Sequence, residues 1–154
     1  ENIMQNVFSE WLCTVKAAEL WFHSAHHLTK GTGFSGDHVN LYGVIYTELQ
    51  EEFDAVAERV LGLTGDEALL CPKHIIAMAL NLLEKYPSPV NMSDHDIALG
   101  AMKLIVDYCQ WENNFHDALD QQGLLTIGLD DLLSTNAGNH ERYAYLLQQR
   151  VKKQ

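Results

Sequence analysis

The chain of 154 residues contains little cysteine and no long apolar run, and each scarcity excludes a class of protein. Its three cysteines, Cys13, Cys71 and Cys109, lie far apart and are odd in number. This argues against a disulfide framework and for a reducing compartment, which we take to be the cytoplasm. No apolar stretch is long enough to cross a bilayer. The first residues also lack the basic segment and apolar core of a signal peptide. We therefore expect a cytoplasmic protein with no membrane segment.

Positive charge is scarce as well. Ten Lys and Arg stand against 21 Asp and Glu, which gives a formal net charge of −11. None of the first fifteen residues is basic, and only Arg150, Lys152 and Lys153 cluster, at the other end. This balance opposes binding to nucleic-acid phosphates and favours cations as ligands. Direct DNA binding is not expected.

Helical periodicity runs through most of the chain. Apolar residues recur at helical spacing over residues 3–29, from Ser35 to Leu61, and over residues 94–121 and 129–151. We expect Ser35 to cap the second helix and Gly62 to end it. A shorter helix, 73–86, lies between prolines in the long connection that follows. The pattern predicts one all-α domain over 1–154, a ferritin-like four-helix bundle with an extra short helix between helices two and three.

The second helix has a feature that a simple bundle does not need. Asp54 and Glu58 are one turn apart, so their carboxylates can converge, and they lie on the side opposite the core residue Leu49. Val44 and Leu61 flank them on that outer face. A solvated face would not need these apolar neighbours. The pattern therefore indicates burial of the acidic pair against another subunit.

Histidines gather just before this helix and predict a metal site. Imidazole and carboxylate together suit iron or zinc, and histidines on the first helix could meet Asp54 and Glu58 if their helices face each other. The alternative is a solvated face in which Arg59 pairs with the carboxylates. The histidines concerned bracket a short glycine-containing turn: His23, His26, His27 and His38.

A site within one bundle receives less support from the spacing. Ferritin-type core sites use Glu on some helices and Glu-x-x-His on their partners. The second half of the chain offers only Glu112 with His116, and His140 with Glu141, and neither pair has that spacing. The candidate ligands crowd into the first two helices.

That crowding resembles the DNA-protection-during-starvation (Dps) mini-ferritins over most of the chain. The family pattern is a His-Trp pair, a Gly, a Phe, a His and then Asp-x-x-x-Glu-Arg. Residues 139–147, NHERYAYLL, are also similar to the family's Glu-His-Glu-Lys-x-x-Trp-Met-Leu. The matching positions of the first pattern are His26-His27, Gly31, Phe34, His38 and Asp54 with Glu58-Arg59.

The resemblance implies a ferroxidase site shared by two subunits. One subunit would supply His26 and His38, and the other Asp54 and Glu58, with His26, Asp54 and Glu58 as the catalytic residues. Fe(II) would be oxidised by hydrogen peroxide or O₂, and the ferric product stored in a shell of twelve subunits. The expected function is iron storage and protection against oxidative stress.

Two departures from the family pattern affect the ligand set. The family's second Asp corresponds to Tyr42, or to Gly43 if the gap lies earlier, and the interval from His38 to Asp54 is one residue longer than usual. Either the turn is lengthened, which moves His38 out of register, or the helix carries a bulge. In the first case His27 or His23 could complete the site. These departures leave two alternatives: a shell that binds zinc or another metal without oxidising iron, and a helical interaction protein without metal.

Overall fold

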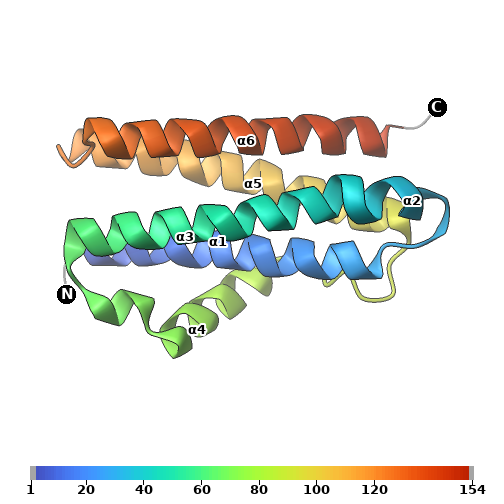
Figure 1. The fold of residues 1–154 in the computed structure, drawn as a ribbon, viewed down its shortest axis with the longest axis horizontal. Helices are drawn as coiled ribbons and strands as arrows, with labels where there is room; N and C mark the ends of the chain where they lie inside the picture. The colour runs from blue at the N-terminus through green and yellow to red at the C-terminus, as the bar shows by residue number, and fades with distance from the viewer. Residues whose placement is uncertain (1–2, 153–154) are drawn as a thin grey trace.

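Four long helices and a shorter fifth one, with one-turn helical segments in the connections, make up the fold of the computed structural model, which describes residues 3–152. The long helices are α1 (Ile3–Leu28), α3 (Val44–Thr64), α5 (Asp94–Gln121) and α6 (Ile127–Val151), and the short helix is α4 (Pro72–Leu83). Figure 1 shows α1 beside α3, α5 beside α6, and α4 outside the bundle next to α1. No strand occurs in the described residues. The predicted all-α bundle with an extra helix in the long connection is confirmed.

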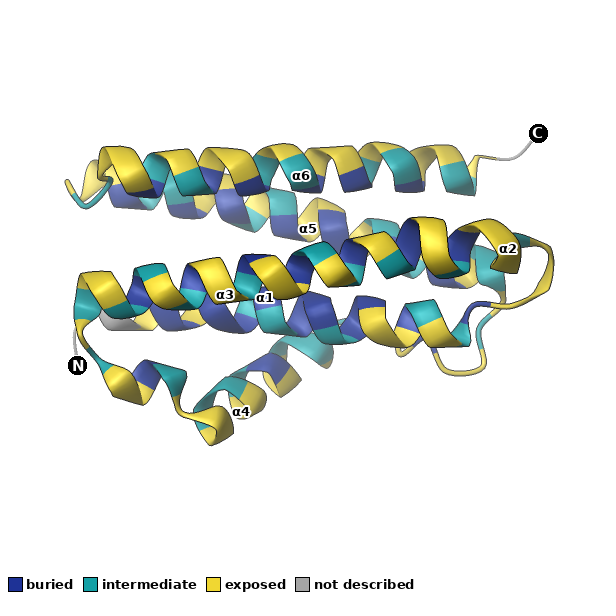
Figure 2. Ribbon diagram, viewed as in Figure 1, coloured by how far each residue is buried: buried dark blue, intermediate teal, exposed yellow. Residues whose placement is uncertain are grey.

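The core lies where the periodicity places it. The inward faces of all four long helices are buried, as Figure 2 shows by the dark stripe along each ribbon. Trp11 and Phe22 of α1 pack in the same cluster as Ile45 and Leu49 of α3. None of the helices in residues 3–152 is long and apolar enough to cross a membrane.

The helix ends show where local signals were interpreted correctly and where they were not. Ser93 accepts a hydrogen bond from the Asp96 backbone N–H and starts α5 at the predicted residue. By contrast, Gly62 lies inside α3, which continues to Thr64 and ends at Gly65 with a left-handed backbone, φ +64°. Ser35 is the second residue of the short helix α2 (Phe34–Asp37), which has no side-chain cap. The predicted stop at Gly62 and cap at Ser35 are therefore wrong.

Between α2 and α3 the chain forms a π-helical turn, His38–Gly43. A π-helical turn accommodates one more residue than an α-helical turn does. The extra residue between His38 and Asp54 is therefore absorbed as a bulge and not by a longer loop. Tyr42, within this turn, is fully buried in the core.

An ion network fixes the end of the bundle that carries this turn. The Arg150 Nε donates to both oxygens of Asp37, at 2.9 and 3.0 Å, and an Arg150 terminal nitrogen lies 3.1 Å from an oxygen of Asp94. The same Asp94 oxygen accepts from the Gly33 backbone N–H at 2.7 Å. The last turn of α6 thus holds α2 and the start of α5 together.

Candidate metal centre

The imidazole rings of His26 and His38 stack on each other at the C-terminal end of α1. Their ring centroids are 4.0 Å apart and the planes differ by 10°. The His38 Nδ1 lies 2.7 Å from the backbone oxygen of His26, and the His26 Nδ1 contacts the backbone oxygen of His38. A carbonyl oxygen only accepts, so each Nδ1 carries the proton. In this tautomer the neutral imidazole has its lone pair on Nε2, which is the form that binds a metal.

The other two histidines of the predicted site, His23 and His27, lie beside this pair. His27 lies with its ring centroid 4.9 Å from that of His26, and the exposed His23 stacks on Tyr46 at 4.2 Å. We call His23, His26, His27 and His38 the histidine patch. A shallow hollow lined by His26, Val39, Val44 and Tyr46 opens beside it. The patch therefore offers several imidazoles on one accessible surface.

Asp54 and Glu58 lie on the outer face of α3, exposed and away from the core, as the periodicity predicted. They are far from the histidine patch of their own chain. Gly43 packs against His26, and Asp54 follows it by 11 residues along the chain, a distance of about 16 Å at the helical rise. Within residues 3–152, no group of three or more His, Cys, Asp or Glu is placed to hold a metal ion. One chain alone does not bring the predicted ligands together.

The π-helical turn brings its backbone close to the histidine patch at Gly43. A Cβ atom there would lie 2.9 Å from the His38 backbone oxygen and 3.2 Å from the His26 Nδ1. The Gly43 backbone is itself helical, φ −62° and ψ −41°, so space and not torsion requires the glycine. Gly138, in the middle of α6, has no atom within 4 Å of a built Cβ.

These two glycines give opposite predictions. We expect Gly43→Ala to lower the free energy of unfolding by about 1–3 kcal/mol through overpacking. We expect the control Gly138→Ala to raise it by up to about 1 kcal/mol, the usual gain from replacing glycine inside a helix. Urea unfolding of both variants measures the difference. A stabilised Gly43→Ala variant would show that the turn does not press on the histidines.

A second cluster, in the bundle core, was not predicted from the sequence. His140 of α6 lies between two carboxylates: its Nε2 is 2.7 Å from an oxygen of Glu52 on α3, and its Nδ1 is 2.7 Å from an oxygen of Glu112 on α5. The Tyr108 hydroxyl donates to the other oxygen of Glu52 at 2.6 Å. We call these four residues the core cluster. The side chains of His140, Glu52 and Glu112 are 0%, 4% and 3% exposed, so the cluster is almost fully buried.

Charge in the core cluster is set by the two carboxylates. Burial lowers the pKa of His140, but Glu52 and Glu112 outweigh it, and the pKa rises to about 9. Burial, with the charges of Glu52 and Glu141, raises the pKa of Glu112 despite its hydrogen bond with His140. Glu112 also has one oxygen that is buried without a hydrogen-bond partner. At neutral pH the imidazole is therefore the cation of the cluster.

A signal for this cluster was present in the sequence. Glu52 lies three residues after Leu49 and four before Val56, and both of these residues are buried. Glu112 and His140 also lie at helical spacing among buried residues of their helices. A charged residue on a core face is rarely buried without a partner. A search of the apolar helix faces for charged residues would therefore have placed Glu52, Glu112 and His140 in the core.

Comparison with known proteins gives likeness in structure and not in sequence. No family model and no curated protein sequence matches the chain. A Dps protein of Bacillus brevis is 19% identical, with 99% of each chain covered and a TM-score of 0.78. A Dps variant of Listeria innocua is 15% identical, with 96% of this chain and 95% of that chain covered and a TM-score of 0.80. A Vibrio cholerae Dps, described as a member of a superfamily of ferritin-like diiron-carboxylate proteins, is 19% identical over 97% of this chain and 89% of its own, with a TM-score of 0.77. The chain thus has the ferritin-like fold of the Dps proteins, in agreement with the resemblance noted in its sequence.

Proposed function

We propose that the protein is a Dps-type mini-ferritin that oxidises and stores iron at sites shared by two subunits. The observation that carries the proposal is the division of the ligands. His26 and His38 are stacked at one end of α3 with both Nδ1 atoms held by backbone oxygens, and Asp54 and Glu58 are exposed about 16 Å or more further along it. Two chains related by a two-fold axis across antiparallel α3 helices would pair each histidine patch with the partner's carboxylates.

The apolar surface of α3 supports this pairing. Val44, near its start, is 37% exposed, Val39 in the preceding turn is 60% exposed, and Leu61, near its other end, is half-buried. In an isologous dimer the same patch faces itself, so the apolar residues at one end cover those at the other. Burial would also remove water from Asp54 and Glu58, which strengthens their attraction for a cation.

Iron is the substrate of the proposed reaction. The neutral imidazoles of His26 and His38 would hold Fe(II), and the carboxylates of Asp54 and Glu58 would stabilise the more highly charged Fe(III). O₂ or hydrogen peroxide would accept the electrons. Twelve chains of −11 each would give a shell a formal charge of about −132, which attracts Fe(II). The proposed role is cytoplasmic iron storage and protection against oxidative stress.

The test is anaerobic loading with Fe(II), followed by hydrogen peroxide or O₂, with ferric absorbance as the readout. We expect fast oxidation by the wild-type protein and a buffer rate for His26→Ala/Asp54→Ala. His116→Ala/Asp117→Ala, an adjacent His and Asp pair on α5, is the control and should retain the wild-type rate. A wild-type rate equal to that of buffer would reject the ferroxidase.

A second candidate is metal binding, for example of zinc, without iron oxidation. Tyr42, at the position of the family's second Asp, is fully buried and offers the surface no ligand. Each shared site would then hold fewer donors than a pair of iron ions needs. Zn²⁺ stoichiometry separates the candidates, because one bound ion per site without Fe(II) oxidation supports the second.

DNA is not a partner in the proposed function. Arg150 of the C-terminal basic cluster is occupied by Asp37 and Asp94. Lys152 is exposed, and Lys153 lies outside the described residues. The electrostatic contribution that DNA binding requires is therefore small.

A further inference from the structure

The core cluster contains the donor types of a metal site but not the arrangement of one. Ferritin-like proteins with iron in the bundle core use carboxylates and imidazoles from facing helices. Here Glu52, Glu112 and His140 come from three helices and are buried in the same place. We propose that His140 is an internal cation that takes the place of a metal ion in the bundle core and closes that core to divalent cations.

The hydrogen bonds show why an ion does not fit. Both ring nitrogens of His140 face carboxylate oxygens at 2.7 Å, on opposite sides of the ring. The two carboxylates are therefore separated by the imidazole and cannot meet on one ion. An ion at either nitrogen would have to displace the proton there and would gain only one carboxylate.

The remaining donors are also accounted for. Glu52 accepts from Tyr108 with one oxygen and contacts His140 with the other, so both of its oxygens are occupied. Of the cluster's carboxylate oxygens, one oxygen of Glu112 has no hydrogen-bond partner among the described residues. Among the described residues, no side chain of α1 forms a hydrogen bond with the cluster, so the fourth helix adds no ligand.

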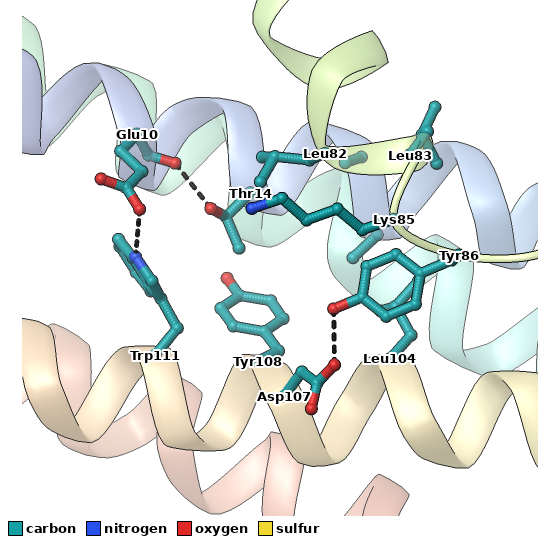
Figure 3. A pocket seen from close by; sticks show the side chains of 12 residues that line it. Glu10, Thr14, Leu82, Leu83, Lys85, Tyr86, Leu104, Asp107, Tyr108 and Trp111 are labelled. Carbon is teal, nitrogen blue, oxygen red and sulfur yellow. Dashed lines mark hydrogen bonds between the residues drawn. The ribbon is translucent and has the colours of Figure 1, made fainter.

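Two hollows border the cluster without exposing His140. Figure 3 looks into a hollow of about 270 Å³ between α1, α4 and α5, with Tyr108 of α5 in its wall. A second hollow, of about 220 Å³, lies between α5 and α6 and is lined in part by Glu112. The imidazole of His140 fills the space between the two carboxylates where an ion would have to bind.

The inference does not depend on the proposed function, but it bears on it. If the core is closed, cations bound by the chain collect at the outer face of α3, where Asp54 and Glu58 are free. His140 would then determine where the metal binds. The role of His140 is tested by measuring metal binding in the core. This measurement does not depend on whether the protein oxidises iron, so the inference can fail or hold independently of the proposed function.

The experiment uses chains that lack the outer ligands, with His26, His38, Asp54 and Glu58 all replaced by Ala. Zn²⁺ binding is measured by calorimetry, with and without Glu112→Gln, so that ions bound elsewhere cancel in the difference. With His140 present, we expect no difference. With His140→Ala, we expect one additional Zn²⁺ per chain, which Glu112→Gln removes. Binding of this ion should raise Tm in the His140→Ala chain only.

Two results would overturn the inference. One is a Zn²⁺ ion that binds while His140 is present and is lost with Glu112→Gln, because the core would then be a metal site. The other is a folded His140→Ala chain that gains no ion. If that chain does not fold, the protonation of the two His140 ring nitrogens is measured by ¹⁵N NMR of the wild-type protein. Two protonated ring nitrogens on His140 at pH 7 support the internal cation, and a free lone pair contradicts it.

Discussion

Mixing two inactive variants is expected to restore about a quarter of the wild-type rate of Fe(II) oxidation, as the arithmetic of a two-fold dimer requires. One variant, His26→Ala/His38→Ala, lacks the histidine half of each site, and the other, Asp54→Ala/Glu58→Ala, lacks the acidic half. Co-expressed in equal amounts, they form mixed dimers half of the time. Each mixed dimer has one intact site and one site that lacks both halves.

The control for this experiment is a mixture whose two members are damaged in the same half. His26→Ala mixed with His38→Ala cannot form an intact site in any dimer, so its rate should stay at that of buffer. If the first mixture shows no recovery while both variants fold and assemble, the halves do not come from different chains. The proposed shared site would then be wrong.

Removing His140 is expected to cost far more stability than removing the whole core cluster. His140→Leu leaves two buried carboxylates without a cation, which costs about 3–5 kcal/mol. A variant with Glu52→Met, Glu112→Met, His140→Phe and Tyr108→Phe has no charge in the core cluster. We expect its free energy of unfolding to equal that of the wild type or to be higher by about 1–4 kcal/mol. Urea unfolding at one fixed protein concentration compares the three proteins.

The same proteins should differ in their response to pH. The pKa of His140 is raised from 6.5 to about 9 in the folded protein. Its contribution to stability is therefore fully present below pH 6.5 and is lost as the pH rises toward about 9. Wild-type stability should fall over this interval, and the variant without buried charge should lack this component. An equal loss in both proteins would show that His140 does not carry the charge.

The sequence predicted those features that depend on local pattern. The limits of α5 follow from the Ser93 cap and the apolar spacing behind it. The outward direction of Asp54 and Glu58 follows from their angle to Leu49. At Gly62 a local rule failed, because α3 continues for three more residues until Gly65 adopts a left-handed backbone.

The features that escaped prediction depend on contacts between distant segments. The spacing left two arrangements open for His38, and only the structure shows the π-helical turn and the stack on His26. The core cluster joins residues 88 and 28 positions apart. Sequence spacing within one helix contains no information about such pairs. The pairing of two chains at Asp54 and Glu58 stays a prediction.

The π-helical turn also sets the rotation of one half of the proposed site relative to the other. In an uninterrupted α-helix, each added residue turns everything beyond it by about 100°. Because His38–Gly43 takes up one residue locally, His38 can lie against α1 while Asp54 and Glu58 keep the outer face of the same continuous rod. The turn therefore fixes the angle between the histidine end and the acidic end. Deleting one residue within it would rotate the histidine end against the acidic end and leave each intact but misaligned.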